Sequence, residues 1–189
     1  MKIAYLTDTF WPRVNGVTVS VETVSAGLTE RGHEVLVQAP YYDVPDYDTD
    51  ERDAAYPFQV KRYRAYRLIL TPNKEDRLVS PEQAFPMARD LGRFEPDLIH
   101  VHTEFSMGVK GAAYAQRHGV PWLVTSHTYF EEYINYYFPW IPHQFGRWFA
   151  RTRQTNFYNK SIGVVAPTSQ MKSVLERYGV TVPIRVIPT

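Results

Sequence analysis

The chain has 189 residues, 44% of them hydrophobic, which is enough for one domain with a substantial apolar core. Its formal net charge of +1 argues against a nucleic-acid-binding protein, because such proteins carry a strongly basic balance. Without cysteine, the chain has no disulfide, no thiolate zinc site and no cysteine nucleophile.

The N-terminus and the apolar runs bear on where the protein acts. An apolar run starts at Lys2 and leaves no room for a signal peptide, so we expect a cytoplasmic protein. All apolar runs are much shorter than the roughly 20 residues that span a bilayer.

The first 39 residues predict a strand, a loop, a helix and a second strand. Residues 2–7 are an apolar run long enough for a buried strand, and over residues 17–28 apolar side chains recur at three- and four-residue steps. Gly32 ends this helix, and a second apolar run covers residues 34–39. Such a βαβ unit implies a parallel sheet, whose ligands bind beyond the carboxyl ends of the strands. We therefore expect a ligand at the loop over residues 8–16.

Strands and helices alternate along the rest of the chain. Residues 40–57 are acidic and aperiodic and predict a long loop, whereas residues 58–71 form an extended, basic segment. Ser80 is the expected N-cap of a helix that runs to about residue 94. Further strands are expected at 97–102, 121–126, 162–167 and 184–188, and further helices at 106–118, 143–158 and 169–178. This alternation predicts a doubly wound α/β fold with a mainly parallel sheet.

Gly16 stands at the start of the first predicted helix. A helix N-terminus presents unpaired N–H groups and suits a phosphate, at about 0.3–2 kcal/mol. The dinucleotide fingerprint G-x-G-x-x-G is absent, since this loop has one glycine where three are needed. From spacing alone, a phosphate contact and a turn glycine that requires a positive φ explain Gly16 about equally well.

Three histidines belong to two neighbouring predicted strands. His100 and His102 are two residues apart on one strand and so point to the same face, and His127 comes just after the next strand. Together they could bind a metal ion, but a histidine inside a covered strand is more often a hydrogen-bonded core residue, which we favour. His127, at the carboxyl end of its strand, is the best candidate for a substrate contact.

Aromatic and basic residues gather in residues 129–158, where no acid follows Glu132. This composition suits the interface of an anionic membrane, at about 1 kcal/mol for each nearby cation. For the loop at 133–142 we favour a contact with an acceptor or a membrane. For the predicted helix at 143–158 we favour the alternative, a stripe of residues that face the core. Its members are Phe145, Trp148, Phe149 and Thr152.

The basic run from Lys61 to Arg67 also has two explanations. On an edge strand its cations are simply solvated, which we favour, and an anion site is the alternative.

Three stretches together carry a family resemblance. They are TDTFWPRVNGVTVSVETVSAGLTERGHEV, PDLIHVHTEFSMGVKGAAYAQRHGVPWLVTSHTYFEEY, and VVAPTSQMKSVLERYGV followed by IRVIPT. Over nearly its whole length the chain resembles the N-terminal domain of the retaining family-4 glycosyltransferases of GT-B fold, which implies a Rossmann-like domain. The combination of TDTFWPRVNGV, HTEFSMG and SHTYFEEY is most similar to the bacterial diacylglycerol glucosyltransferases, which make membrane glycolipids.

The resemblance implies roles for individual residues. Gly16 matches the glycine whose backbone approaches the diphosphate of the donor, with Asn15 and Val17 beside it. His127 matches the histidine near the donor sugar, where a carbonyl or imidazole can steady positive charge at the anomeric carbon. Four more residues match the acceptor pocket (Glu104 and Tyr133) and the loop that faces the cleft (Thr168 and Ser169).

The resemblance also implies a reaction. Family enzymes transfer a sugar from a nucleotide sugar with retention of configuration, generally without a metal, and the leaving phosphate is thought to help deprotonate the acceptor. We therefore expect a nucleotide-sugar donor, a diacylglycerol-like lipid acceptor, an anionic membrane surface as partner on the inner face of the cell membrane, and neither cofactor nor metal. The alternatives are a soluble or polyprenyl-linked acceptor, as for a mannosyltransferase, and a free-standing, non-catalytic α/β binding module.

The second domain of the family, which binds the nucleotide, is absent from residues 1–189, and IRVIPT matches the start of the interdomain linker. We therefore expect a single acceptor-side domain that does not turn over by itself. In such a domain the loop at 8–16 is expected to be mobile and empty.

Overall fold

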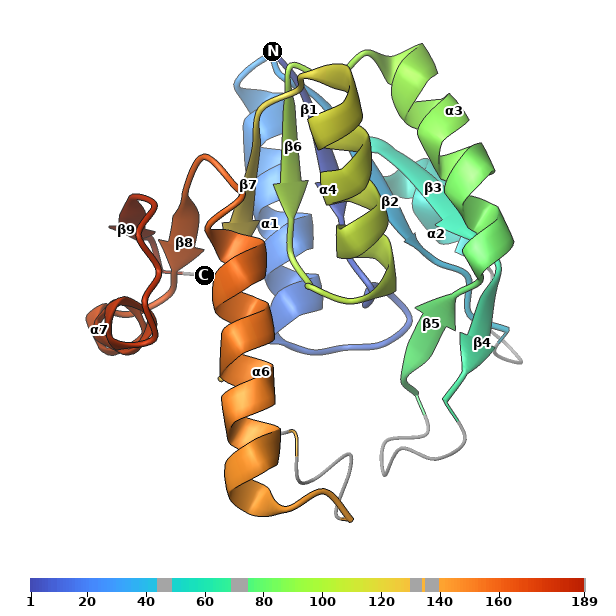
Figure 1. Cartoon of the computed structure of the whole chain (residues 1–189). Coiled ribbons are helices and arrows are strands. Elements are labelled where there is room, and N and C mark those ends of the chain that lie inside the picture. The colour runs from blue at the N-terminus through green and yellow to red at the C-terminus, as the bar shows by residue number, and fades with distance from the viewer. Residues whose placement is uncertain (44–48, 69–74, 130–133, 135–139, 189) are drawn as a thin grey trace.

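The computed structural model describes residues 1–43, 49–68, 75–129, 134 and 140–188. Within these residues, seven parallel strands form one sheet in the order β3-β2-β1-β6-β7-β8-β9, with helices on both faces (Figure 1). The strands are β1 (Lys2–Leu6), β2 (Glu34–Pro40), β3 (Gln59–Tyr63), β6 (Leu98–Val101), β7 (Trp122–Thr125), β8 (Val164–Ala166) and β9 (Ile184–Val186). The helices are α1 (Gly16–Glu30), α2 (Thr49–Ala55), α3 (Ala84–Phe94), α4 (Ser106–His118), α6 (His143–Tyr158) and α7 (Ser169–Arg177), with a 3₁₀ turn at Pro81–Gln83. This architecture confirms the predicted doubly wound α/β fold.

The central strands are apolar on both faces because helices cover both faces. β1 lies between β2 and β6, with Tyr5 paired to Val37 on one side and to His100 on the other. Successive side chains of β1 enter two different apolar cores. Tyr5 shares one core with Val21 of α1, and Leu6 shares the other with residues of α3 and α4. In Figure 1, α1 lies behind the sheet and α4 lies in front of it.

The structure differs from the predicted elements between residues 40 and 80. α2 lies in the segment predicted as a loop. The prediction missed it because seven residues are too few to show a helical period, although Asp50 and Glu51 suit the first turn of a helix. The basic segment is divided into β3 and β4 (Ala65–Arg67), and β4 pairs antiparallel with β5 (Arg77–Val79). Ser80 precedes the 3₁₀ turn as predicted, but its hydroxyl forms no capping hydrogen bond.

β3 is an edge strand of the described sheet, as predicted, but its basic residues are not all solvated. The Arg62 side chain is buried, and its Nη2 and Nε donate to the two carboxylate oxygens of Asp53 at 2.7 and 2.8 Å. Its Nη1 donates to the carbonyl oxygen of Trp11 at 2.7 Å. Arg62 therefore connects α2 and the first loop to the edge of the sheet.

The three aromatic residues of the predicted core stripe of α6 do not face the core, in contrast to the expectation from the sequence. Phe145, Trp148 and Phe149 are 56%, 53% and 48% exposed. A Cβ at Gly146 would lie 3.3 Å from both Ile134 and Ile141, so the inner face of α6 has no room for a larger residue at this position. Its buried positions are Gly146, Ala150, Gln154 and Tyr158, and Thr152 is partly buried. Among the described helices, α6 included, none combines the length and the hydropathy needed to cross a membrane.

Candidate functional site

Four segments meet at one edge of the sheet, which we call the carboxyl edge. Because β1, β6, β7 and β8 are parallel neighbours, the residues that follow them lie along the same edge. These segments are the first loop at 7–16, then 102–105, 126–129 and 167–169. Each candidate residue within the described part of the chain belongs to one of them or to the helix that follows it.

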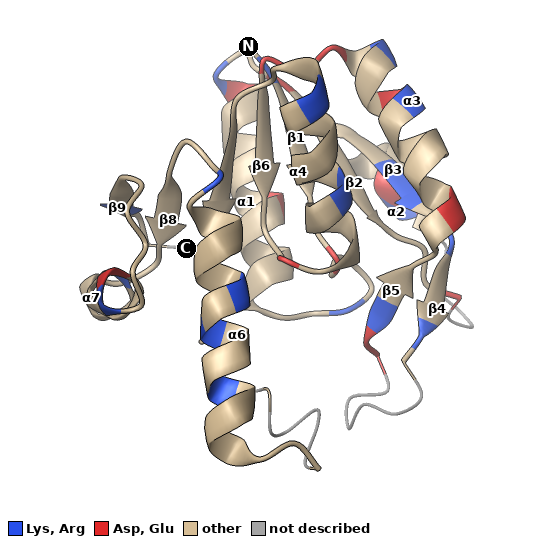
Figure 2. Ribbon diagram, in the orientation of Figure 1, with Lys and Arg blue, Asp and Glu red and all other residues tan. Residues whose placement is uncertain are grey.

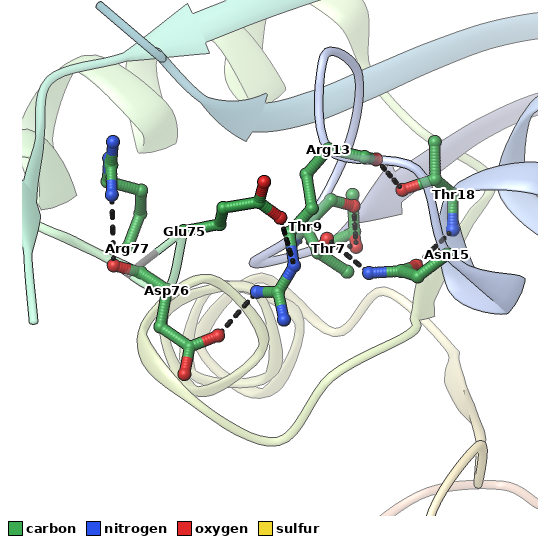
Figure 3. Close-up of polar contacts among 8 residues, drawn as sticks. All are labelled: Thr7, Thr9, Arg13, Asn15, Thr18, Glu75, Asp76 and Arg77. Atoms are coloured by element: carbon green, nitrogen blue, oxygen red, sulfur yellow. Dashed lines mark hydrogen bonds and ion pairs between the residues drawn. The ribbon is translucent and has the colours of Figure 1, made fainter. Parts of the chain in front are cut away.

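The first loop is held by hydrogen bonds among its own residues (Figure 3). The Asn15 side chain caps α1, because its Oδ1 accepts from the backbone N–H of Thr18 at 2.9 Å. Its Nδ2 donates to Thr9 Oγ1, also at 2.9 Å. The Thr7 hydroxyl donates to the carbonyl oxygen of Thr9 at 2.7 Å and accepts from the Thr9 backbone N–H at 3.2 Å. These bonds fix the direction of the first N–H groups of α1.

Side chains also tie the first loop to other elements. Arg13 Nη1 donates to Asp76 Oδ1 at 2.5 Å, next to β5 (Figure 3). The Thr18 hydroxyl donates to the Arg13 carbonyl at 2.8 Å, and Trp11 Nε1 donates to Glu22 Oε2 of α1 at 2.6 Å. The loop is therefore hydrogen-bonded along its length, and its mobility in the isolated chain stays a prediction.

Asp8 joins the first loop to α4. Its carboxylate accepts hydrogen bonds from Thr103 Oγ1 at 2.6 Å, from the Ser106 hydroxyl and from the backbone N–H of Met107 at 2.9 Å. Burial raises the pKa of this carboxyl, while the three donors act in the opposite direction. Because Met107 lies in the first turn of α4, Asp8 of the first loop caps that helix. Sequence analysis missed this role, and its only signal is an acid placed directly after the first strand.

Gly16 is the first residue of α1 and faces open space. Its φ is not positive: among the described glycines, a positive φ occurs at Gly32, Gly119 and Gly179. The explanation of Gly16 as a turn glycine is therefore wrong. A Cβ at Gly16 would meet no atom within 4 Å, so the described fold does not require glycine there. Val17, beside it, is partly buried against the core beneath α1.

Three histidine rings and Tyr5 pack together near the carboxyl edge. The Tyr5 ring centroid is 4.9 Å from those of His100 and His102, whose own centroids are 4.2 Å apart. His100 and His102 thus share a face, as predicted. His100 Nε2 lies 2.7 Å from Thr125 Oγ1, and His102 Nδ1 lies 2.9 Å from His127 Nε2. His127 and His100 are partly exposed, whereas His102 between them is buried.

Burial keeps these imidazoles neutral. It lowers the pKa of His127 to about 4 and that of His100 to about 3, and it also lowers the pKa of His102. One nitrogen of each ring is directed at a protein group, because His100 Nε2 contacts Thr125 while His102 Nδ1 and His127 Nε2 face one another. Among the described residues, no three His, Asp or Glu side chains are placed to hold a metal ion. The group has the hydrogen-bonded arrangement that the sequence analysis favoured.

Glu104 lies at the carboxyl edge, but its carboxylate is buried against α6. Its Oε1 accepts from Gln154 Nε2 at 2.6 Å and from the Tyr158 hydroxyl at 3.1 Å. Its backbone oxygen accepts from Arg153 Nη2 at 2.9 Å. Burial raises the pKa of the Glu104 carboxyl, and these bonds make the residue an anchor for α6. Tyr133, its expected partner in an acceptor pocket, lies outside the described residues.

Thr168 and Ser169 lie at the start of α7, directly after β8. The Thr168 hydroxyl accepts from the backbone N–H of Met171 at 3.0 Å and so caps the helix. Both residues are exposed. The N-termini of α1 and α7 are thus capped at the carboxyl edge, as that of α4 is by Asp8.

Comparison with known proteins shows which family and which solved fold the chain matches. Residues 14–189 match the family described as Glycosyltransferase Family 4. The chain is 29% identical to an alpha-monoglucosyldiacylglycerol synthase of Streptococcus pneumoniae, over 100% of this chain and 40% of that protein. It is 33% identical to a GDP-mannose-dependent alpha-mannosyltransferase of Mycobacterium tuberculosis, over 64% of this chain and 30% of that protein.

A solved structure shares the fold. Sucrose-phosphate synthase from Thermosynechococcus elongatus superposes with a TM-score of 0.66 and 16% sequence identity, over 99% of this chain and 47% of that chain. This similarity confirms the Rossmann-like α/β domain expected for a GT-B protein. The chain thus spans less than half the length of each of these three proteins.

Proposed function

Because the chain belongs to glycosyltransferase family 4, we propose that it is the acceptor-side domain of an enzyme that transfers a sugar to a membrane lipid. The donor is a nucleotide sugar, the acceptor is diacylglycerol-like, and the anomeric configuration is retained. The chain spans 40% of the pneumococcal glucosyldiacylglycerol synthase, and we place the nucleotide-binding domain of the enzyme outside these 189 residues.

The N-terminus of α1 contacts the diphosphate of the donor in this proposal. Its first N–H groups carry a partial positive charge, and the Asn15 cap fixes their direction. The open space at Gly16 leaves room for phosphate oxygens to approach the backbone. A contact of about 0.3–2 kcal/mol orients a ligand that the other domain holds more tightly.

His127 lies next to the donor sugar in this proposal. It is partly exposed at the carboxyl edge, and burial lowers its pKa to about 4, so the ring is neutral at pH 7. A neutral ring does not repel the positive charge that develops at the anomeric carbon, whereas an imidazolium would. Either the ring or the backbone carbonyl of His127 then steadies that charge.

The proposed reaction uses no resident cofactor and no metal. As the sugar–phosphate bond breaks, the leaving phosphate takes the proton of the acceptor hydroxyl on the same face of the sugar. The new glycosidic bond forms on that face, which retains the configuration. The chain therefore supplies binding and orientation rather than a nucleophile.

The exposed aromatic face of α6 is the main support for a lipid acceptor in this proposal. Phe145, Trp148 and Phe149 belong to the first half of the helix, which Figure 1 shows extending past the carboxyl ends of the strands. The same helix carries arginines and no acid (Figure 2). Aromatic rings enter the interfacial layer of a bilayer, and each arginine near an anionic surface adds about 1 kcal/mol. We propose that α6 holds the carboxyl edge against an anionic membrane.

Co-sedimentation with vesicles tests this surface. We expect the chain to sediment with vesicles that contain phosphatidylglycerol and to stay in solution with phosphatidylcholine alone. The double substitution Trp148→Ala/Phe149→Ala should weaken binding at least about tenfold, because a buried aromatic side chain contributes about 1.5–3 kcal/mol. Phe85→Ala is the matched control, since Phe85 is 75% exposed but lies on α3. The proposal would be contradicted if vesicle binding did not depend on anionic lipid, or if the double substitution left vesicle binding unchanged.

A soluble or polyprenyl-linked acceptor is the second candidate, and the mycobacterial mannosyltransferase match favours it. With a soluble acceptor α6 does not bind vesicles, and for either kind of acceptor a screen of nucleotide sugars and acceptors with the longer protein identifies the pair. A non-catalytic binding module is the third candidate. It predicts that the longer protein transfers no sugar in the same screen.

A further inference from the structure

We propose that His102 fixes the tautomer of His127 so that His127 presents an N–H donor at the carboxyl edge. The inference rests on the proposed place of His127 beside the donor sugar. Three observations carry it. His102 Nδ1 lies 2.9 Å from His127 Nε2. His102 is 2% exposed, and its other ring nitrogen, Nε2, is buried without a hydrogen-bond partner.

The contact between the two rings contains one proton. Both imidazoles are neutral, so each carries a single N–H, and two nitrogens 2.9 Å apart form a bond only if one donates and the other accepts. In the first arrangement, His102 Nδ1–H donates to His127 Nε2, and His127 bears its own proton on Nδ1. In the second, His127 Nε2–H donates to His102 Nδ1, and His102 bears its proton on Nε2.

The surroundings of His102 distinguish the two arrangements. The second one buries an N–H at His102 Nε2 that donates to nothing, and orphaned buried N–H groups are rarer in proteins than under-satisfied acceptors. Within the described residues no acceptor lies in hydrogen-bond reach of His102 Nε2, and the rings of Tyr5 and His100 pack against His102 at interplanar angles of 34° and 37°. The first arrangement leaves a bare lone pair at that position. The geometry therefore assigns the donor to His102.

This assignment determines what His127 offers to a ligand. Its Nδ1 has no hydrogen-bond partner within the described residues and carries the proton. The ring then donates to an oxygen of the donor, either a sugar hydroxyl or a phosphate oxygen. A donor N–H does not steady positive charge, so that task falls to the His127 carbonyl. His102 acts through His127 and is a positioning residue.

Nitrogen NMR of the chain tests the assignment without any activity measurement. In ¹⁵N-histidine-labelled protein at pH 7, protonated and bare ring nitrogens have well-separated shifts. We expect His127 and His102 each to show a protonated Nδ1 and a bare Nε2. A protonated Nε2 on His127, or a mixture of both tautomers, would overturn the proposal.

Two substitutions of His102 provide a matched pair. His102→Asn places an amide N–H close to the position of Nδ1, whereas His102→Gln places its amide near the position of Nε2. His127 should keep its single tautomer in the first variant and lose it in the second. If His127 shows the same tautomer in both folded variants, His102 does not control it. If neither variant folds, the spectrum of the unsubstituted chain decides.

Sugar transfer by the longer protein separates this inference from the proposed function. With both correct, transfer is lost with His102→Gln and rescued with His102→Asn. If the tautomers behave as expected but transfer does not follow them, the positioning of His127 stands and its place beside the donor sugar fails.

Discussion

Gly16 is a residue whose identity nothing in the described fold requires, since a Cβ there would meet no atom within 4 Å. Gly16→Ala should leave the free energy of unfolding unchanged or raise it by about 0.4–1 kcal/mol, because alanine restricts the unfolded chain. If the backbone of Gly16 approaches a diphosphate, the added methyl group blocks that approach. The KM for the nucleotide sugar in the longer protein should then rise about 2- to 30-fold, the equivalent of 0.3–2 kcal/mol. Urea unfolding and donor-dependent transfer rates measure the two effects.

Gly27→Ala is the control for this substitution. Gly27 lies on the same helix, and a Cβ there would be 3.5 Å from Arg31 Nη1, an ordinary contact. It should gain stability with no change in KM. An unchanged KM in Gly16→Ala would remove the backbone at this position from the donor site.

The buried imidazoles make stability depend on pH. The pKa of His127 falls from 6.5 to about 4 on folding, so the folded chain binds fewer protons than the unfolded chain between these values. The contribution of His127 to the free energy of unfolding, on the order of 3 kcal/mol, is complete above about pH 6.5 and is lost as the pH falls toward 4. Asp8 and Glu104, whose pKa values are raised, act with the opposite sign, since they favour folding more as the pH falls.

His127→Gln isolates this term, because it removes one titrating group and leaves both carboxyls in place. The free energy of unfolding of the unsubstituted chain, minus that of the variant, should decrease from pH 7 to pH 4. Urea unfolding at a series of pH values measures the difference. A constant difference would show that His127 titrates alike in the folded and unfolded chains.

For single residues, the sequence predicts a position next to a helix or strand end better than it predicts a contact with a distant residue. Gly16 and His127 could be placed because they directly adjoin a helix start and a strand end, which are local features. The contact of His102 with His127 depends on the register between β6 and β7, which local periodicity does not determine. Asp8 was missed because its partner Met107 is 99 positions away in the chain.

For helices, the sequence periodicity predicts the bounds, whereas the packing environment determines which face is buried. The bounds of α4 and α6 coincide with the predicted ranges, because both have clear limits in the sequence. The prediction of which face of α6 is buried was wrong, because the spacing of apolar residues does not reveal how closely a neighbouring segment approaches the helix. Gly146 packs against Ile134 and Ile141, and the side chains of Phe145, Trp148 and Phe149 are exposed on the other face of the helix.

α4 lies so close to the sheet that one of its glycines cannot be replaced without strain. A Cβ at Gly108 would be 1.8 Å from the backbone oxygen of Thr103 and 2.6 Å from Val101 Cγ1. Gly108→Ala should therefore lower the free energy of unfolding by on the order of 3 kcal/mol. At Gly92 of α3 the added Cβ would lie 3.7 Å from the Tyr114 hydroxyl, so Gly92→Ala should stabilise by about 0.5–1 kcal/mol. Urea unfolding of the two variants is the measurement, and effects of equal sign would contradict the packing of α4.

For the whole molecule, the alternation of strands and helices was enough to predict a parallel sheet, because right-handed crossovers leave few topologies. The β4–β5 pair and α2 fall outside this alternation and were not predicted, since short polar segments carry little periodic signal. Both lie beside the first loop, where Asp76, next to β5, accepts from Arg13 and Arg52 of α2 lies over the Trp11 ring, 4.0 Å from its centroid. The parts that sequence patterns describe least well are thus those that fix the loop at the carboxyl edge.

The proposed split of the enzyme into two domains predicts what the 189-residue chain does alone. Two apolar cores cover the two faces of its sheet, so it should unfold cooperatively, with coincident transitions by circular dichroism and tryptophan fluorescence. Because α6 belongs to this chain, it should bind anionic vesicles by itself. Because the proposal places the nucleotide in the other domain, the 189-residue chain should transfer no sugar, whereas a protein extended to the length of the pneumococcal relative should bind vesicles and transfer sugar. Transfer by the 189-residue chain would contradict the split, and vesicle binding that requires the longer protein would move the membrane surface away from α6.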